Sequence, residues 1–335
     1  MKTILLCSVL SALAILLLPS APRTEVPEAQ DELVLWIEEA GAAAQVTAEI
    51  AQEDAAEPAK ERPVSLRAAD KLLSLTEEEY LTAVVLAEMP ASFEPEALRA
   101  QAVAARTFLR RKEQGGKHAD CDVCADSACC QAWLSEAELE AKYGAELDAY
   151  WDKAADAVRT TADEVLTWEG KLIDATYFSC SGGSTEAAVA VWGTDVPYLQ
   201  AVESPGEQDA LRYESEVCFP EDGLRTRLQT AAPEARLSGH AEDWFGETTW
   251  TEGGGVDTMV IGGVSFTGTQ LRSLLGLNST KFTVRCGDGE VRFHVLGFGH
   301  RVGMSQYGAN AMAKLGFDYR TILQYYYRGA KIEEI

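Results

Sequence analysis

The stretch Thr76–Lys112, TEEEYLTAVVLAEMPASFEPEALRAQAVAARTFLRRK, decides how the folded part of the chain begins. Thr76 and Glu79 have the spacing of a capping box, in which two side chains bond the free amides of a helix start. The helix is predicted to run to about Met89, because Pro90 cannot continue it. Since proline is favoured in the first turn of a helix, a second helix is predicted from Pro95 to about Lys112.

Outside this stretch the pattern changes from helices to strands. A polar helix is predicted over about Ser135–Arg159, and two short helices over about Ser305–Leu315 and Tyr319–Tyr327. Short runs bounded by Gly and Asn turns predict strands at Val165–Trp168, Lys171–Phe178, Asp257–Ile261, Phe282–Arg285 and Val291–Val295. Because helices and strands are partly segregated, we expect an α+β fold with a helical N-terminal part and a mixed or antiparallel sheet.

The chain is strongly acidic. Its 335 residues include 29 Lys and Arg against 53 Asp and Glu, so its formal net charge is −24. Nucleic-acid binding needs a basic surface that displaces counterions from phosphates, so we expect no nucleic-acid partner. The same charge argues against docking on anionic lipid head groups. A neutral or cationic partner, or a polysaccharide, fits this composition better.

The N-terminus has the features of an export segment. Ile4–Leu18 contains no charged residue and would span about 22 Å as a helix, short of a bilayer core of roughly 30 Å. Residues 1–21 are predicted to be a signal peptide or, since the cleavage site is poor, an N-terminal membrane anchor. Either outcome places the body of the protein outside the cytoplasm. Residues 22–63, rich in Ala and Glu, are predicted to be an acidic spacer, and 64–335 a globular domain.

Glu88 is predicted to lie on the apolar side of the first helix. Leu81, Val84 and Val85 precede it by seven, four and three residues, which places all four side chains on one stripe. Burial beside aliphatic groups raises the pKa of a carboxyl, as a general acid at neutral pH requires. The alternative is a glutamate near a helix end that reaches solvent past the stripe.

Five potential zinc ligands follow in one short loop. His118, Cys124 and Cys130 are spaced His-x5-Cys-x5-Cys, and Cys121 and Cys129 lie between them. Zinc prefers thiolate and imidazole ligands, and three protein ligands would leave a fourth position for water. In an exported protein the same cysteines could form disulfides instead, and the spacing alone does not separate the two interpretations.

Two glycine-rich stretches are candidates for ligand contacts. Tyr177–Glu186 is predicted to be a strand that enters two glycines flanked by hydroxyl side chains, where the backbone can approach a ligand. Gly297–Gly308 enters a capped helix, and its Gln306 and Tyr307 could face a sugar. The alternatives are an ordinary turn and a structural loop. The first stretch lacks the serine-hydrolase pattern Gly-x-Ser-x-Gly, and the second lacks the Lys-Ser/Thr ending of a P-loop.

Several of these stretches, taken together, resemble the SpoIID domain family, named after stage II sporulation protein D. The similarity covers roughly residues 70–330, and the motifs occur in the family's order. They are Glu78–Leu81 with Val85–Pro90, Ala97–Thr107, Asp122–Cys124 with Cys130–Ala132, Ser181–Glu186 with Val191–Gly193, Pro197–Leu199, and Val302–Ala309.

The resemblance implies a peptidoglycan lytic transglycosylase acting in spore engulfment. Such enzymes cleave the β-1,4 bond between N-acetylmuramic acid and N-acetylglucosamine and leave a 1,6-anhydro end, because the substrate's own C6 hydroxyl attacks C1. Glu88 matches the family's catalytic acid, which would protonate the leaving oxygen and then accept the C6 hydroxyl proton. Residues 64–335 would form the catalytic domain, with a substrate cleft between lobes.

The same resemblance implies a cofactor, a partner and a location. His118, Cys124 and Cys130 match positions that hold zinc in a clostridial relative. The expected substrate is glycan whose stem peptides have been removed by an amidase partner, stage II sporulation protein P. The enzyme would be anchored in the mother-cell membrane and face the intermembrane space, or be secreted if the signal is cleaved. The expected substrate contacts are Gln101, Arg106, Tyr177, Ser181, Gly182, Gly183, Thr185, Gln306 and Tyr307.

Two positions depart from the family pattern. Arg301 replaces the middle glycine of a Gly-His-Gly-Val-Gly loop, where a positive φ would strain it unless the loop differs or Arg301 contacts sugar. Cys129 stands where relatives often have His, and Cys121 is extra. Two alternative functions stay open, a non-catalytic wall-binding amidase enhancer and a zinc-dependent wall hydrolase.

Overall fold

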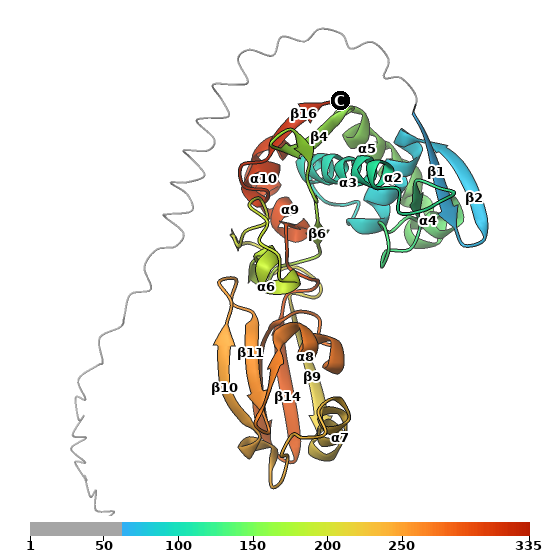
Figure 1. Ribbon diagram of the computed structural model, residues 1–335. Coiled ribbons are helices and arrows are strands. Elements are labelled where there is room, and N and C mark those ends of the chain that lie inside the picture. The colour runs from blue at the N-terminus through green and yellow to red at the C-terminus, as the bar shows by residue number, and fades with distance from the viewer. Residues whose placement is uncertain (1–61) are drawn as a thin grey trace, which may run out of the picture. The chain divides into compact units, whose positions relative to one another are not determined.

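Figure 1 shows the computed structural model, which describes residues 62–335. The predicted signal peptide or anchor, and all but the end of the predicted spacer, lie outside the described residues. The described part begins with a hairpin of β1 (Pro63–Ala68) and β2 (Lys71–Thr76), and β3 (Val123–Cys124) pairs with β1 in parallel. Within this part no helix is long and apolar enough to cross a membrane.

The two helices predicted from Thr76–Lys112 are confirmed. α2 (Glu77–Glu88) begins at the predicted capping box, in which Thr76 Oγ1 accepts from the amide of Glu79 and Glu79 accepts from that of Thr76. α3 (Pro95–Gly115) starts at the predicted proline and ends before Gly116, whose φ of 55° is left-handed. Local capping and proline positions therefore suffice to place both helices.

The single helix predicted over 135–159 is interrupted. The chain forms α4 (Glu136–Tyr143), a 3-10 turn (Gly144–Glu146) and α5 (Leu147–Arg159). Gly144 ends α4 with φ 56° and ψ −131°, a conformation that only glycine adopts readily, so the chain changes direction there.

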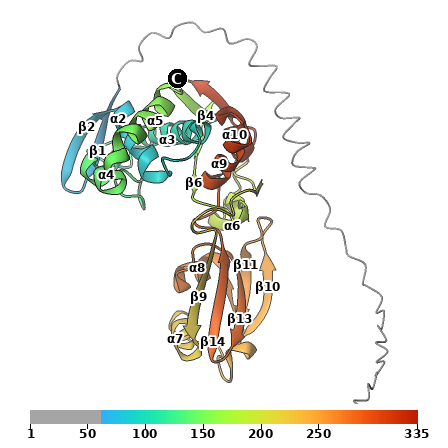
Figure 2. The same cartoon turned by 180° about the vertical axis from the view of Figure 1, so that it is seen from behind.

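The two helices predicted near the C-terminus are confirmed as α9 (Gln306–Lys314) and α10 (Tyr319–Tyr326). α3 contacts α2, α5, α9 and α10, and these elements surround it in Figures 1 and 2. Its buried residues include Leu98, Val103 and Leu109. α3 is therefore the central helix of the helical part.

Small sheets tie these helices together. β4 (Glu164–Trp168) pairs with β5 (Lys171–Leu172) and with β16 (Lys331–Glu334), so the C-terminal strand joins the middle of the chain. β6 (Tyr177–Phe178) pairs in parallel with β15 (Met304–Ser305). The single strand predicted over 171–178 is therefore wrong, because the chain leaves one sheet after Leu172 and joins another at Tyr177. A further two-stranded sheet joins β7 (Gly183–Ser184) to β8 (Glu203–Ser204), with α6 (Ala188–Trp192) between them.

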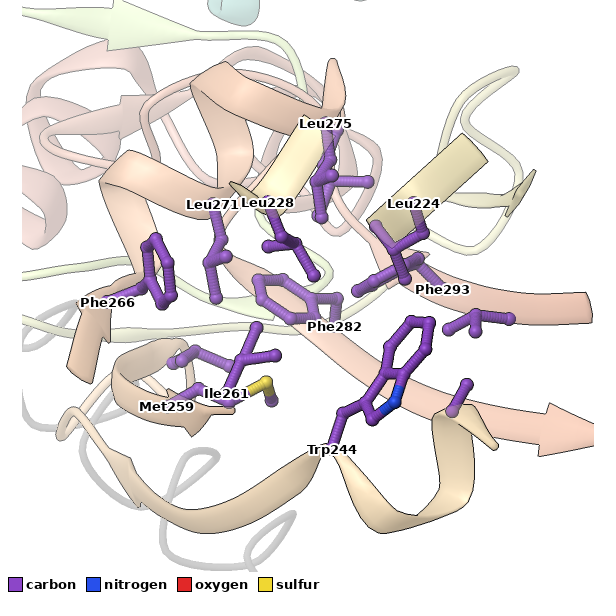
Figure 3. Packing of buried hydrophobic residues seen from close by; sticks show 14 of the residues in the cluster. Leu224, Leu228, Trp244, Met259, Ile261, Phe266, Leu271, Leu275, Phe282 and Phe293 are labelled. Atoms are coloured by element: carbon purple, nitrogen blue, oxygen red, sulfur yellow. The ribbon is translucent and has the colours of Figure 1, made fainter. Parts of the chain in front are cut away.

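Residues 214–296 form an antiparallel β part with its own core, drawn yellow to orange in Figure 1. Its core joins side chains from two helices, from two sheets and from Trp244, and it includes Leu224, Leu271, Phe282 and Phe293 (Figure 3). Three of its strands were predicted near their observed positions. One sheet contains β13 (Lys281–Gly287), β14 (Glu290–Leu296) and β9 (Glu214–Pro220). The other sheet contains β10 (Phe245–Trp250), β11 (Val256–Ile261) and β12 (Val264–Thr267). The two helices are α7 (Glu221–Ala231) and α8 (Gly268–Leu275).

The fold is α+β with mixed and antiparallel sheets, as the segregation of the patterns predicted. The substrate cleft between lobes stays a prediction.

Candidate active site and metal centre

Glu88 is the last residue of α2 and is partly buried. The backbone N–H of Ala132 donates to its Oε1 at 2.7 Å. Burial raises the pKa of Glu88, although Ala132, Tyr177 and Lys142 each favour the charged form. The predicted apolar stripe is only part of the cause, because α2 is buried without a break from Tyr80 to Leu86. Glu88 lies where that buried helix opens onto a pocket.

The pocket beside Glu88 has a volume of about 660 Å³. Gln306 and Tyr307, two of the predicted sugar contacts, line it from the start of α9. The ring of Phe93 packs edge-on against Tyr307, with ring centroids 4.9 Å apart, and so fixes its orientation. The lining also includes Lys142, Tyr143, Glu146, Tyr150, Leu211, Arg212 and Phe298. Aromatic rings, an amide and a carboxyl with a raised pKa are groups that suit a sugar-cleaving site.

Two further predicted contacts, Tyr177 and Gln101, lie behind this lining. The hydroxyl of Tyr177 donates to Oε1 of Gln131 at 2.8 Å, and Nε2 of Gln131 donates to the hydroxyl of Tyr80 at 3.3 Å. Gln101 is fully buried and accepts a 3.4 Å hydrogen bond from Nε2 of Gln306. Within residues 62–335, Nε2 of Gln101 has no partner of its own. Gln101 therefore supports Gln306 from inside the protein, whereas Tyr177 is partly exposed and lies close enough to Glu88 to favour its charged form.

The predicted metal ligands come together, with one addition. The donor atoms of His118, Cys124, Cys129 and Cys130 all lie within 4.8 Å of one another. Nε2 of His118 is 3.4 Å from Sγ of Cys130 and 3.6 Å from Sγ of Cys129. Zinc bonds of about 2.0 Å to nitrogen and about 2.3 Å to sulfur in a tetrahedron separate such donors by about 3.6 Å, so the set fits zinc.

The remaining cysteines of this loop, Cys121 and Cys129, differ in their positions relative to the cluster. Cys129 stands as a fourth potential ligand, and Cys121 is buried outside the cluster. None of the seven cysteines in the described part of the chain forms a disulfide. The thiols of the described cysteines are therefore free, and the four clustered donor atoms are available to a metal ion.

Most of the Ser-Gly-Gly-x-Thr-Glu stretch lies inside the protein. The amide and hydroxyl of Ser181 and the amide of Gly182 all donate to the carboxylate of Glu207, at 2.6 to 3.3 Å. Ser181 and Thr185 have no exposed surface, and Gly182 is buried. A sugar cannot reach these three residues in this structure. Gly183 is partly exposed but lies outside the lining of the pocket.

Arg106, also predicted to contact substrate, is buried with 1% of its surface exposed. Its guanidinium bonds Glu77 and the main-chain carbonyls of Val158, Thr161 and Glu164. All of these partners are structural: they tie α3 to the start of α2 and to the chain between α5 and β4. The predicted substrate contact by Arg106 is therefore wrong, because a side chain enclosed in this way cannot reach a sugar.

Arg301 has the positive φ that the family loop predicted, 65°. Its side chain is fully buried and pairs with Glu186 at 3.0 Å. It also donates to the carbonyls of Ser181, Ser184 and Gly253. Since every donor group has a partner within the protein, a sugar contact by Arg301 does not occur in this structure.

Sequence patterns missed several polar residues of the pocket, among them Lys142, Tyr150 and Arg212. Lys142 and Tyr150 lie in the segment predicted as one polar helix, where nothing distinguishes a pocket residue from a solvated one. Arg212 lies between two β elements, in a segment without a motif.

Comparison with known proteins agrees with these motifs. The family model described as stage II sporulation protein matches residues 67–168. Stage II sporulation protein D of Bacillus subtilis (strain 168) is 37% identical over 290 residues, which cover 83% of this chain and 82% of that protein. The chain belongs to the stage II sporulation protein D family.

Two further proteins are similar to this chain. Stage II sporulation protein D of Bacillus amyloliquefaciens is 36% identical, again over 83% of this chain and 82% of that protein. A protein of Bacillus subtilis (strain 168) named amidase enhancer is 29% identical over 75% of this chain and 40% of its own length. Membership of the family supports a role in sporulation that involves the cell wall.

Proposed function

We propose that this member of the family is a lytic transglycosylase that cleaves the N-acetylmuramic acid–β-1,4–N-acetylglucosamine bond of peptidoglycan. The observation that carries the proposal is Glu88, a partly buried carboxyl with a raised pKa at an aromatic-lined pocket of about 660 Å³. A protonated carboxyl in such a place can donate to a glycosidic oxygen. The pocket volume lies in the range of ordinary ligand sites.

The residues around Glu88 have distinct tasks in this reaction. Glu88 protonates the leaving oxygen and then accepts the proton of the C6 hydroxyl as that oxygen attacks C1, which gives the 1,6-anhydro product. Between these steps Glu88 is an anion, and the Ala132 N–H and the Lys142 ammonium stabilise it. Tyr307 offers a ring for stacking and Gln306 an amide for hydrogen bonding to sugar hydroxyls.

A zinc ion would be held by His118, Cys124, Cys129 and Cys130. Four protein ligands close a tetrahedral site, and a closed site supplies fold stability rather than an activated water. This supports a structural zinc over a zinc-dependent wall hydrolase. The loop that the ion would close leads directly into Gln131 and Ala132, both of which support the active site.

The biological setting is part of the proposal. The substrate is glycan freed of stem peptides, the amidase partner is stage II sporulation protein P, and the site of action is the intermembrane space during engulfment. An N-terminal anchor would hold the domain there. The family relationship to stage II sporulation protein D supports this setting.

The test is product analysis with purified variants on peptide-free glycan strands. Glu88→Gln should fold like the wild type and release anhydro products about 10²- to 10⁴-fold more slowly, the usual contribution of general acid–base catalysis. Glu146→Gln removes the other carboxylate of the same pocket and should retain activity. Full activity of Glu88→Gln would overturn the proposal.

The alternative is a wall-binding amidase enhancer, the name of one relative. Under that alternative the wild type would bind glycan and stimulate an amidase without forming anhydro products. Glu88→Gln would then stimulate the amidase as well as the wild type does.

A further inference from the structure

The pocket beside Glu88 contains two positive side chains, although the protein as a whole is strongly negative. Lys142 and Arg212 both line it, in a chain whose formal net charge is −24. Lys142 donates to the carbonyl of Leu86 at 2.8 Å and is close enough to Glu88 to favour its charged form. Arg212 forms no ion pair or side-chain hydrogen bond anywhere in the described residues. A cation without a partner at the rim of a pocket is available to an anionic ligand.

Arg212 is held in place even though its charge is unpaired. Its guanidinium carbon lies 4.5 Å from the centroid of the Phe298 ring, so the planar group lies against an aromatic face. Its backbone carbonyl accepts a hydrogen bond from Sγ of Cys180, and the next carbonyl, of Tyr213, accepts from the amide of Gly297 at 2.7 Å. These contacts leave the fork of N–H groups without an acceptor.

The segment that carries Arg212 is anchored from below by a buried carboxylate. Glu207 has 1% of its surface exposed and accepts from Ser181, Gly182 and Ser204. The amide of Ala210 then bonds the carbonyl of Glu207, and the amide of Tyr213 bonds that of Ala210. The glycine-rich motif therefore positions the rim of the pocket, although it does not contact sugar itself.

Among residues 62–335, only one other carboxylate, Glu146, lines the pocket with Glu88. The hydroxyl of Tyr150 donates to it at 3.2 Å, and it forms no ion pair with Arg212 in the described part of the chain. The rim of the pocket can therefore accept a ligand anion without displacing an internal partner.

We propose that Arg212, assisted by Lys142, binds the lactyl carboxylate of a peptide-free N-acetylmuramic acid residue. This inference rests on the proposed function, because it assigns the residues by which the Glu88 pocket would recognise the peptide-free substrate proposed there. In intact wall the lactyl group is an amide to the stem peptide and has no charge. Removing the peptide creates a carboxylate, and the planar fork of an arginine binds a carboxylate through two parallel hydrogen bonds. The cations thus select stripped glycan.

The test measures binding without turnover, in the Glu88→Gln background. The probes are a peptide-free glycan tetrasaccharide and the same tetrasaccharide whose lactyl carboxylates have been converted to methylamides, compared by calorimetry. The free-acid form should bind about tenfold more tightly, as one charge-assisted contact provides. Arg212→Gln should abolish this preference and leave the affinity for the methylamide unchanged. The matched control is Arg227→Gln, because the Arg227 guanidinium also lies against an aromatic ring, 5.3 Å from that of Phe219, but outside the pocket. This variant should keep the preference for the free acid.

The outcomes separate the two proposals. If Arg212→Gln still prefers the free acid, or if the parent binds both forms equally or neither, the inference is overturned. The proposed function would stand in those cases as long as the wild type releases anhydro products. If the wild type forms none while the binding preference follows Arg212, the carboxylate site stands and the proposed chemistry fails.

Discussion

The backbone N–H of Ala132 donates a 2.7 Å hydrogen bond to Oε1 of Glu88. Ala132 lies two residues after Cys130, a ligand of the candidate zinc site, and 44 residues after Glu88 in sequence. The loop that brings the metal ligands together therefore also brings a hydrogen-bond donor to the proposed catalytic acid. Gln131, between them, accepts from the hydroxyl of Tyr177. If the cluster binds a metal ion, its binding would be coupled to the position of Glu88 through the three consecutive residues 130–132.

Glu88 should make the stability of the protein depend on pH in a defined direction. Because burial raises its pKa above the unfolded value of about 4.3, its contribution is fully present below that pH and is lost as pH rises through the folded pKa. Gln cannot ionise and can keep the bond from Ala132. Glu88→Gln should therefore melt at a higher temperature than the wild type at pH 7, and this difference should shrink at pH 4. Thermal unfolding at both values tests this, and a difference that is largest at pH 4 would contradict it.

Removal of the metal should destabilise the fold and slow catalysis together. When the free metal concentration is 1,000 times the Kd, binding stabilises the folded state by about 4 kcal/mol, and chelation removes that contribution. Glu88 would then lose the ordered Ala132 amide, so activity should fall without a change in the type of product. Cys129→Ser should lower the metal content and the melting temperature. Cys121→Ser, in the same loop but outside the cluster, is the control, and an equal effect of both would exclude the proposed ligand set.

The sequence predicted what local chemistry determines. The α2 start follows from Thr76 and Glu79, which are three residues apart, and the α3 start follows from Pro95. The cluster of candidate metal ligands was noticed because its members lie within thirteen consecutive residues, although the ligand set taken from the family resemblance omitted Cys129. The apolar neighbours of Glu88 on α2 made it a candidate acid, and the family resemblance made it the proposed one. In each case the partners are close in sequence, so a pattern can report them.

Residues whose partners lie far along the chain were misjudged. Ser181 was expected at a sugar because hydroxyls and glycines often line ligand sites, but its partner Glu207 is 26 residues away. Arg106 was expected at substrate, but the carbonyls that enclose it lie more than 50 residues later. Arg212 was missed because only the folded chain brings it to the pocket of Glu88. Burial of a charged side chain depends on tertiary partners, which composition and periodicity do not show.

The fold should be more stable with Arg301 than with the glycine that is usual at this position in the family. At φ 65° an arginine is strained by roughly 1–2 kcal/mol, which Arg301→Gly would relieve. The same change leaves Glu186 buried without its charge partner, and breaking such a pair costs about 3–5 kcal/mol. The second effect is larger, so Arg301→Gly should lower the free energy of unfolding by about 1–4 kcal/mol. Urea denaturation measures this, and the double variant with Glu186→Gln should recover part of the loss; a stabilised Arg301→Gly would contradict the argument.

Gly308 in α9 should tolerate no side chain, despite its helical position. A Cβ there would collide with the hydroxyls of Tyr326 and Ser204 and approach Oε1 of Glu207, the carboxylate that anchors the Arg212 segment. Alanine favours a helix over glycine by about 1 kcal/mol, but crowding a packed interior costs about 1–3 kcal/mol, and here the obstacles are hydrogen-bonded to one another. Gly308→Ala should therefore lower the unfolding free energy by about 1–2 kcal/mol and weaken binding of peptide-free glycan by displacing Arg212. Gly115→Ala, at the end of α3 with open space around its Cβ, is the matched control and should be neutral or stabilising. If both variants behave alike in denaturation and glycan binding, the buried Ser204–Tyr326–Glu207 contact does not position the rim of the pocket.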